Sequence, residues 1–189
     1  GFESGDEKIL HNIRKVATLD DNNRCIEIAK RNNLKVKALM SIGHAGESHK
    51  TIENTKNWLL RVGPDDFDCT IITTYPGSPY FDNAQKQGNI YVYTDPKTND
   101  RLYQSPINYL EDLDYYKGDP EDGYVSYVWT DYISSQDLVK ERNELEIEVR
   151  NKLNIALNPS RPGVEYEHSM GQGNVSIPDY ILRNSTTGL

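Results

Sequence analysis

Three short segments combine glycine with small polar or acidic side chains, which is the composition of a ligand-binding loop. They are GFESG at residues 1–5, GHAGES at 43–48 and TTYPGSP at 73–79. The second loop precedes a helical pattern, where free backbone N–H groups and the helix dipole attract an anion or a nucleotide. A Walker A loop needs Gly directly before a Lys-Thr pair, and His49 stands at that position here. A triphosphate site is therefore disfavoured, and a plain strand-to-helix turn remains open as an alternative.

The segments around these loops predict the elements that hold them in place. Apolar residues at helical spacing indicate four helices, at residues 5–16, 18–33, 48–62 and 79–88. Thr18 is the expected N-cap of the second helix, and Gly88 the C-cap of the fourth. Apolar and β-branched runs indicate two strands, at residues 34–43 and 67–79. This alternation is typical of a parallel sheet, which binds ligands at the carboxyl ends of its strands, so we expect all three loops to meet there.

The second half of the chain has a different character, and we expect an α+β extension over residues 89–189. Eleven of the thirteen tyrosines fall between Tyr75 and Tyr132, which indicates an elaborated surface. Opposite charges at i,i+4 spacing predict one long helix. The expected parts are a hairpin at 89–106, a Tyr-rich acidic loop at 107–131, the long helix at about 135–155 and an irregular tail.

Composition argues against two kinds of partner. A net charge of -8 disfavours a nucleic-acid backbone, because phosphate contacts need clustered Lys and Arg. No apolar run approaches the roughly 18 residues of a membrane span, so we expect a cytoplasmic protein with no membrane partner. The two cysteines, Cys25 and Cys69, match no metal-binding spacing and lie in apolar patterns, so both are predicted to be buried.

The three loops, in this order and at this spacing, resemble the second half of the radical S-adenosylmethionine (SAM) enzymes. The resemblance is to the branch that often carries an upstream cobalamin-binding domain. In that family the motifs read Gly-x-Glu-Ser-Gly after the fourth barrel strand, Gly-x-Pro-Gly-Glu-Thr after the fifth and Pro-x-Pro-Gly-Thr-Pro after the sixth. The resemblance covers residues 1 to about 90, with four conservative departures at Ala45, Ser48, Thr74 and Ser78.

The fold implied by this resemblance is α/β: the second half of a (β/α)6 partial TIM-like barrel over residues 1–88, followed by the α+β extension. The implied cofactors of the parent enzyme are SAM and a [4Fe–4S] cluster, with cobalamin as a further candidate. The implied reaction is methyl transfer, methylthiolation or an oxidative rearrangement. The family's Cys-x-x-x-Cys-x-x-Cys loop is missing, and Cys25 and Cys69 cannot replace it. We therefore expect a C-terminal piece of a longer polypeptide that is inactive alone.

The resemblance also implies a set of SAM contacts. In chain order these are Glu3, Ser4, Leu39, Met40, Gly43, Glu47, Thr73, Thr74 and Tyr75. The first two would face the ribose and amino-acid groups, and the next two the adenine. The glycine would allow close backbone approach, the glutamate would orient its loop, and the last three would contact the adenine again. Each has an ordinary alternative role, in helix capping, in the sheet core or in a turn.

The four histidines raise the question of a metal. His44 and His49 flank Glu47, but their spacing matches no zinc motif, so we predict no metal site. His168, in the irregular tail, is the candidate for substrate contact.

An alternative function belongs to a different class of protein. The chain could be a non-catalytic scaffold that uses the Tyr-rich region 89–132 as its binding surface. In either case half a barrel would leave an unpaired sheet edge. We expect the C-terminal segment to cover that edge, or a second copy to pair with it in a homodimer.

Overall fold

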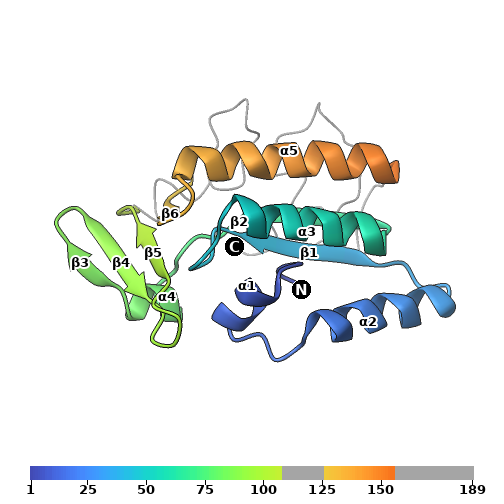
Figure 1. Ribbon diagram of the computed structural model, residues 1–189, viewed down its shortest axis with the longest axis horizontal. Helices are drawn as coiled ribbons and strands as arrows, with labels where there is room; N and C mark the ends of the chain where they lie inside the picture. Colours follow the sequence, from blue (N-terminus) through green and yellow to red (C-terminus); the bar gives the residue numbers. More distant parts are fainter. Residues whose placement is uncertain (108–125, 156–189) are drawn as a thin grey trace, which may run out of the picture.

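Two sheets organise residues 1–107 and 126–155, the part of the chain described by this computed structural model (Figure 1). The first is parallel and pairs β1 (Lys37–Ile42) with β2 (Asp66–Ile71), from Lys37 opposite Asp66 to Ile42 opposite Ile71. The start of the chain continues this sheet. The amides of Phe2 and Glu3 donate to the carbonyl of Leu39, and Glu3 forms a parallel bridge with Met40. The first of the three loops therefore lies beside the carboxyl half of β1.

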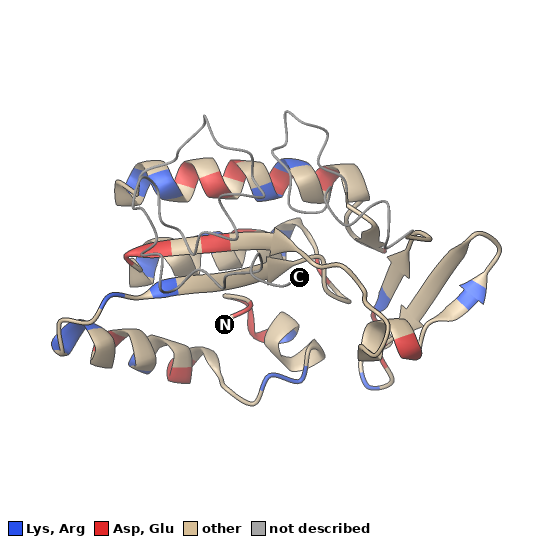
Figure 2. Ribbon diagram, turned by 180° about the vertical axis from the view of Figure 1, so that it is seen from behind, with Lys and Arg blue, Asp and Glu red and all other residues tan. Residues whose placement is uncertain are grey.

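Helices cover one face of the parallel sheet. The first three helices are α1 (Glu7–Asn12), which follows the first loop, α2 (Leu19–Arg31), and α3 (His49–Val62), which follows the second loop. Thr18 caps α2 as predicted, in a reciprocal pair with Asp21, because its hydroxyl accepts one of the free amides of the first turn. In Figures 1 and 2, seen from opposite sides, α3 lies on one face of β1 and β2, between α2 and α5 (Ser135–Leu153).

Alternation along the strands places the core beneath α3. In β1 the side chains of Ala38, Met40 and Ile42 are buried, whereas those of Leu39 and Ser41 point to the opposite face. The same alternation in β2 buries every second residue. These side chains pack with the apolar face of α3 into one hydrophobic cluster, which includes Ile52, Trp58, Leu59, Phe67, Cys69 and Ile71.

The outer edge of β2 is covered by side chains of α5. Arg142 Nε donates to the Cys69 carbonyl at 2.8 Å, and Arg150 Nη2 donates to the Phe67 carbonyl at 2.6 Å. The Cys69 amide donates to Glu146 Oε1 at 3.4 Å. Side chains thus satisfy backbone groups that would otherwise form an exposed strand edge. Figure 2 shows how acidic and basic residues alternate along this helix.

The second sheet is antiparallel, with four strands in the order β3-β4-β5-β6. Their bounds are β3 (Gln85–Gln87), β4 (Ile90–Thr94), β5 (Arg101–Gln104) and β6 (Val128–Thr130). The β4–β5 pair is the predicted hairpin. Val92 stands opposite Tyr103, and Tyr103 opposite Trp129, so these three side chains share one face. The fold is thus mixed α/β, with a parallel two-stranded sheet and an antiparallel four-stranded sheet.

Several boundaries differ from the sequence-based expectation. The helix predicted over 79–88 is only one turn, α4 (Pro79–Asp82), and β3 follows it, so the boundary drawn at residue 88 falls within the β3–β4 turn. The loop predicted over 107–131 contains β6. Cys25 is exposed on α2, while Cys69 is buried as predicted. The long helix is confirmed, with Ser134 as its N-cap.

Within residues 1–107 and 126–155, the structure contains no helix that is both long and apolar enough to cross a membrane.

Candidate ligand-binding site at the carboxyl ends of the parallel strands

Glu3 brings a partly exposed carboxylate to the carboxyl half of β1. Its backbone has φ of 66°, a left-handed conformation that costs a non-glycine residue energy and is often found at functional sites. Its side chain is 33% exposed. One carboxylate oxygen accepts from Lys15 Nζ at 3.2 Å, and the other from the Ser41 hydroxyl at 3.2 Å. The carboxylate is thus fixed by two partners while part of its surface remains open.

Ser41 connects Glu3 to the second loop. The Ser41 hydroxyl lies 2.8 Å from His44 Nε2, and His44 Nδ1 lies 3.4 Å from the Tyr80 hydroxyl. Tyr80 follows the third loop directly and lies in the first turn of α4. Its hydroxyl oxygen accepts from the Ala45 amide at 3.4 Å. One hydrogen-bonded series of side chains therefore runs from the first loop through the second loop to Tyr80, the residue that follows the third loop.

His44 is neutral in this environment. Its imidazole is buried, and burial lowers its pKa to about 4, although the negative charge of Glu3 acts in the opposite direction. A neutral imidazole donates through one nitrogen and accepts through the other.

Glu47 holds the second loop from inside. It is 1% exposed, and its carboxylate accepts from the Gly43 amide at 3.0 Å and from the Thr51 hydroxyl at 2.5 Å. Burial raises the pKa of Glu47 to about 7, and these two hydrogen bonds limit the rise. Its backbone carbonyl also accepts from the Thr130 hydroxyl of β6 at 2.7 Å. The Glu47 carboxylate therefore ties the start of the second loop to the first turn of α3, and both bonds lie inside the protein.

The β4–β5 turn also supports the second loop. Asp100 accepts from Asn12 Nδ2 at 2.9 Å and from Lys8 Nζ at 3.1 Å, and Asn12 donates in addition to the Ala45 carbonyl at 2.8 Å. Gly46, with φ of 85°, lies so close that a Cβ would be 2.7 Å from both Asn12 Nδ2 and Asp100 Oδ2. Only glycine fits this approach. The antiparallel sheet therefore helps to fix the site, a role for Asn12 and Asp100 that the sequence did not indicate.

The predicted site residues divide into two groups by exposure. Leu39, 49% exposed, and Tyr75, 36% exposed, reach the surface, and Glu3 and Thr73 are partly exposed. The others lie inside the protein: Ser4, Met40, Gly43, Glu47 and Thr74. Of these, Ser4 bonds to Thr55 of α3 at 3.1 Å, and Met40 belongs to the core cluster. We expect the buried group to act through packing, and the exposed group to meet a ligand. His168 lies outside the described residues.

The cysteines do not fit an iron–sulfur cluster. Cys25 is exposed on α2 and Cys69 is buried in β2 among core side chains, so they cannot act on one cluster. The two histidines considered for zinc have different partners, since His49 bonds to Glu141 of α5 and His44 to Ser41. Among the residues that the structure describes, no group of three His, Cys, Asp or Glu side chains could hold a metal ion.

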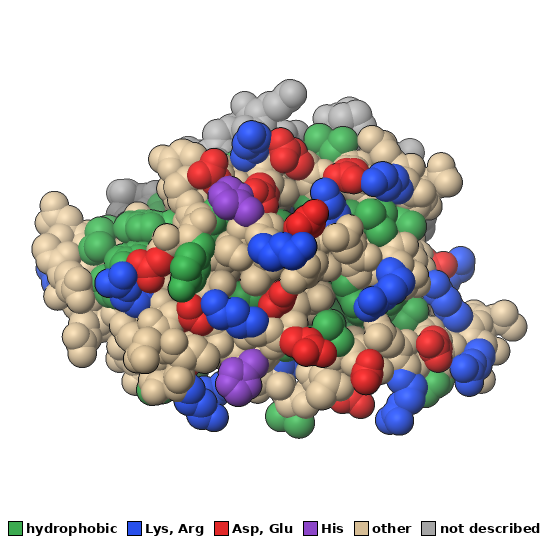
Figure 3. All heavy atoms as spheres, in the orientation of Figure 1, with side chains coloured by type: hydrophobic (Ala, Val, Ile, Leu, Met, Phe, Trp, Pro, Cys, Tyr) green, Lys and Arg blue, Asp and Glu red, His purple; other side chains and the backbone are tan. Residues whose placement is uncertain are grey.

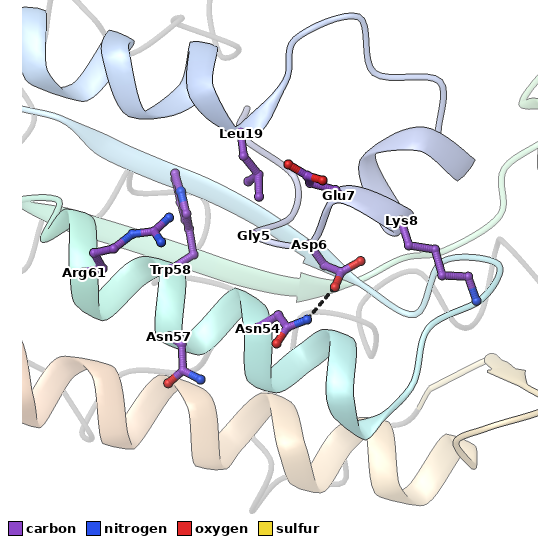
Figure 4. Close-up of a pocket in the computed structure, with 9 residues that line it drawn as sticks. All are labelled: Gly5, Asp6, Glu7, Lys8, Leu19, Asn54, Asn57, Trp58 and Arg61. Atoms are coloured by element: carbon purple, nitrogen blue, oxygen red, sulfur yellow. Dashed lines mark hydrogen bonds between the residues drawn. The ribbon is translucent and has the colours of Figure 1, made fainter.

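A separate pocket of about 500 Å³ lies on the helical side of the sheet (Figure 4). Asn54 of α3 donates to Asp6 across its wall at 2.7 Å. Its lining consists of Gly5, Asp6, Glu7, Lys8, Leu19, Asn54, Asn57, Trp58 and Arg61. None of the residues implied as SAM contacts lines this pocket, so it is distinct from the site at the strand ends.

Comparison with protein-family models and with curated proteins gave no match to this chain.

Proposed function

We propose that the chain forms the second half of a (β/α)6 partial barrel of a radical SAM enzyme and carries part of its SAM-binding surface. One observation carries the proposal. Glu3 is hydrogen-bonded beside β1 like a neighbouring parallel strand, and its partly exposed carboxylate lies at the carboxyl ends of the strands. This is the edge of a parallel sheet at which ligands bind.

The exposed residues of the site suit the chemistry of SAM. A carboxylate such as Glu3 can accept hydrogen bonds from the ribose hydroxyls or from the ammonium group. The half-exposed Leu39 offers apolar contact to adenine, and Tyr75 offers a ring face for stacking. In such an enzyme, bound SAM would yield methionine and a deoxyadenosyl radical once it received one electron from the enzyme's cluster. The residues of this chain bind and orient the cofactor.

The residues of this chain do not fit an iron–sulfur cluster, because Cys25 is exposed on α2 and Cys69 is buried in the core. The three thiolate ligands of the parent enzyme's cluster would have to lie outside this sequence. The choice among methyl transfer, methylthiolation and oxidative rearrangement, and the use of cobalamin, would be decided there as well.

Calorimetric titration with SAM, adenosine and magnesium ATP tests the proposal. We expect weak binding of SAM and adenosine, and no magnesium-dependent binding of ATP. Replacing Glu3 by Gln should weaken SAM binding by about tenfold, because a charged acceptor is lost. The matched control is Glu7→Gln, which removes an exposed carboxylate from α1. Failure of the unmodified chain to bind SAM at millimolar concentration would overturn the proposal, as would magnesium-dependent ATP binding.

A second candidate function is a binding scaffold, favoured by the face of the antiparallel sheet that carries Tyr103 and Trp129. Their rings stack at 5.7 Å with an 8° interplanar angle, and the Arg101 guanidinium lies 5.4 Å above Tyr103. Apolar side chains gather at the end of the molecule formed by the antiparallel sheet, at the left of Figure 3. The scaffold function predicts no affinity for SAM, so the same titration separates the two candidates.

A further inference from the structure

The hydrogens between Glu3 and Tyr80 can be assigned by elimination. The Glu3 carboxylate only accepts, so the single proton of Ser41 must be donated to it. The Ser41 oxygen then accepts at 2.8 Å, which requires a proton on His44 Nε2. A neutral imidazole protonated at Nε2 accepts at Nδ1, so the Tyr80 hydroxyl donates there. The Tyr80 oxygen accepts from the Ala45 amide, a donor whose direction is fixed by the backbone.

The opposite tautomer breaks this series. With the proton on His44 Nδ1, Nε2 would take the Ser41 proton, and two oxygens, those of Ser41 and Glu3, would face each other at 3.2 Å without a hydrogen between them. Tyr80 supports the first arrangement, because burial raises its pKa and keeps its hydroxyl protonated. The series therefore has one direction, from the Ala45 amide to the Glu3 carboxylate.

We propose that His44 is a positioning residue for the ligand: through Ser41, it holds the Glu3 carboxylate in one orientation toward a hydroxyl or ammonium donor. Each carboxylate oxygen uses one lone pair, for Ser41 or for Lys15, and retains another for the ligand. The inference rests on the proposed function for the identity of that ligand. His44 is the variable position of the glycine-rich loop motif, so the motif alone would not assign it a role.

The series of hydrogen bonds from Ala45 through Tyr80, His44 and Ser41 to Glu3, called the relay below, is tested first, without any ligand. A long-range proton–nitrogen correlation spectrum of the labelled chain reports which imidazole nitrogen carries the proton, and the spectrum of a His44→Gln variant identifies the His44 signals. We expect the Nε2-protonated tautomer. The Nδ1-protonated tautomer, or a charged His44 at pH 7, would overturn the relay whatever the chain binds.

The role in recognition is tested by SAM titration of three variants. His44→Leu removes the donor and should weaken SAM binding about tenfold. His44→Gln places an amide donor near the position of Nε2 and should restore most of the affinity. Ser41→Ala breaks the relay one step later and should cost as much as His44→Leu, with little further loss in the double variant. The matched control, His49→Leu, replaces an imidazole that lies outside the relay.

The outcomes separate the two proposals. If the unmodified chain binds SAM and the His44→Leu and Ser41→Ala variants bind it equally well, the positioning role is wrong while the proposed function stands. If the unmodified chain does not bind SAM, the proposed function is wrong, and SAM is then not the ligand of the Glu3 carboxylate. Urea unfolding of each variant shows whether an affinity loss reflects a failure to fold: the Ser41→Ala variant leaves the buried imidazole in place and should remain folded.

Discussion

Replacing Arg150 by alanine is expected to lower the free energy of unfolding by about 3–5 kcal/mol, because one partner of a buried ion pair is removed. The guanidinium is 2% exposed and bonds to Glu146 at 2.8 Å, to Asp66 at 3.1 Å and to the Phe67 carbonyl at 2.6 Å. It also lies 4.7 Å above the Phe67 ring. Its loss leaves a β2 carbonyl without this donor and weakens the pairing of a buried carboxylate.

The buried carboxylate of Glu146 is the main reason for this large expected decrease in the free energy of unfolding. Burial raises the pKa of Glu146, while the charges of Arg150 and Arg142 act to lower it. Without Arg150, the nearest remaining cation is Arg142, 3.7 Å from the carboxylate. The matched control is Lys152→Ala, which breaks an exposed ion pair on the same helix and should cost less than about 1 kcal/mol. Urea unfolding measures both, and equal small losses in the two variants would contradict the account of how α5 covers β2.

Replacing Glu47 by glutamine is expected to raise the free energy of unfolding by about 3 kcal/mol at pH 8 and to leave it unchanged near pH 4.5. The pKa of Glu47 is about 7 in the folded protein against an ordinary value of 4.5, and each unit is worth about 1.4 kcal/mol. A raised carboxyl pKa means that the folded state binds the proton more tightly than the unfolded state. Glu47 therefore costs nothing below about pH 4.5, and its cost grows as the pH rises to about 7.

The glutamine variant keeps the hydrogen bonds of the loop. Its amide oxygen can accept from the Gly43 amide, and its NH2 group can donate to the Thr51 oxygen, because the Thr51 proton has a second acceptor in the Ser48 carbonyl at 2.9 Å. We expect the variant to match the unmodified chain near pH 4.5 and to exceed its stability by about 3 kcal/mol at pH 8.

Urea unfolding at a series of pH values makes this measurement. The control is Glu7→Gln, which makes the same substitution at an exposed carboxylate of α1. A difference between the unmodified chain and the Glu47→Gln variant that stays constant from pH 4.5 to 8 would show that the carboxylate does not titrate as described.

The features that the sequence predicts well are those with local causes. Thr18 marks the start of α2 because a hydroxyl at an N-cap and a carboxylate three residues later satisfy each other within one turn. The long helix begins at Ser135 for the same kind of reason. The parallel pairing of β1 with β2 follows from apolar runs separated by a helix.

The features that the sequence misses depend on distant contacts or on weak patterns. Strand β3 is the polar stretch Gln85–Gln87, exposed throughout, so no alternation of apolar residues reveals it. Asn12 and Asp100 are far apart in the chain, and their contact across Gly46 exists only once both sheets are in place. The link from Glu3 to His44 likewise depends on strand pairing.

The central claim, that SAM binds at the carboxyl ends of the parallel strands, is tested most directly by amide chemical shifts in the labelled chain during titration with SAM. We expect the largest chemical-shift changes on Glu3, on Ser41 and His44, and on the loop at 73–75. Changes confined to the pocket between α1, α2 and α3 (Figure 4), or to the antiparallel sheet, would contradict the claim, as would a spectrum that SAM leaves unchanged.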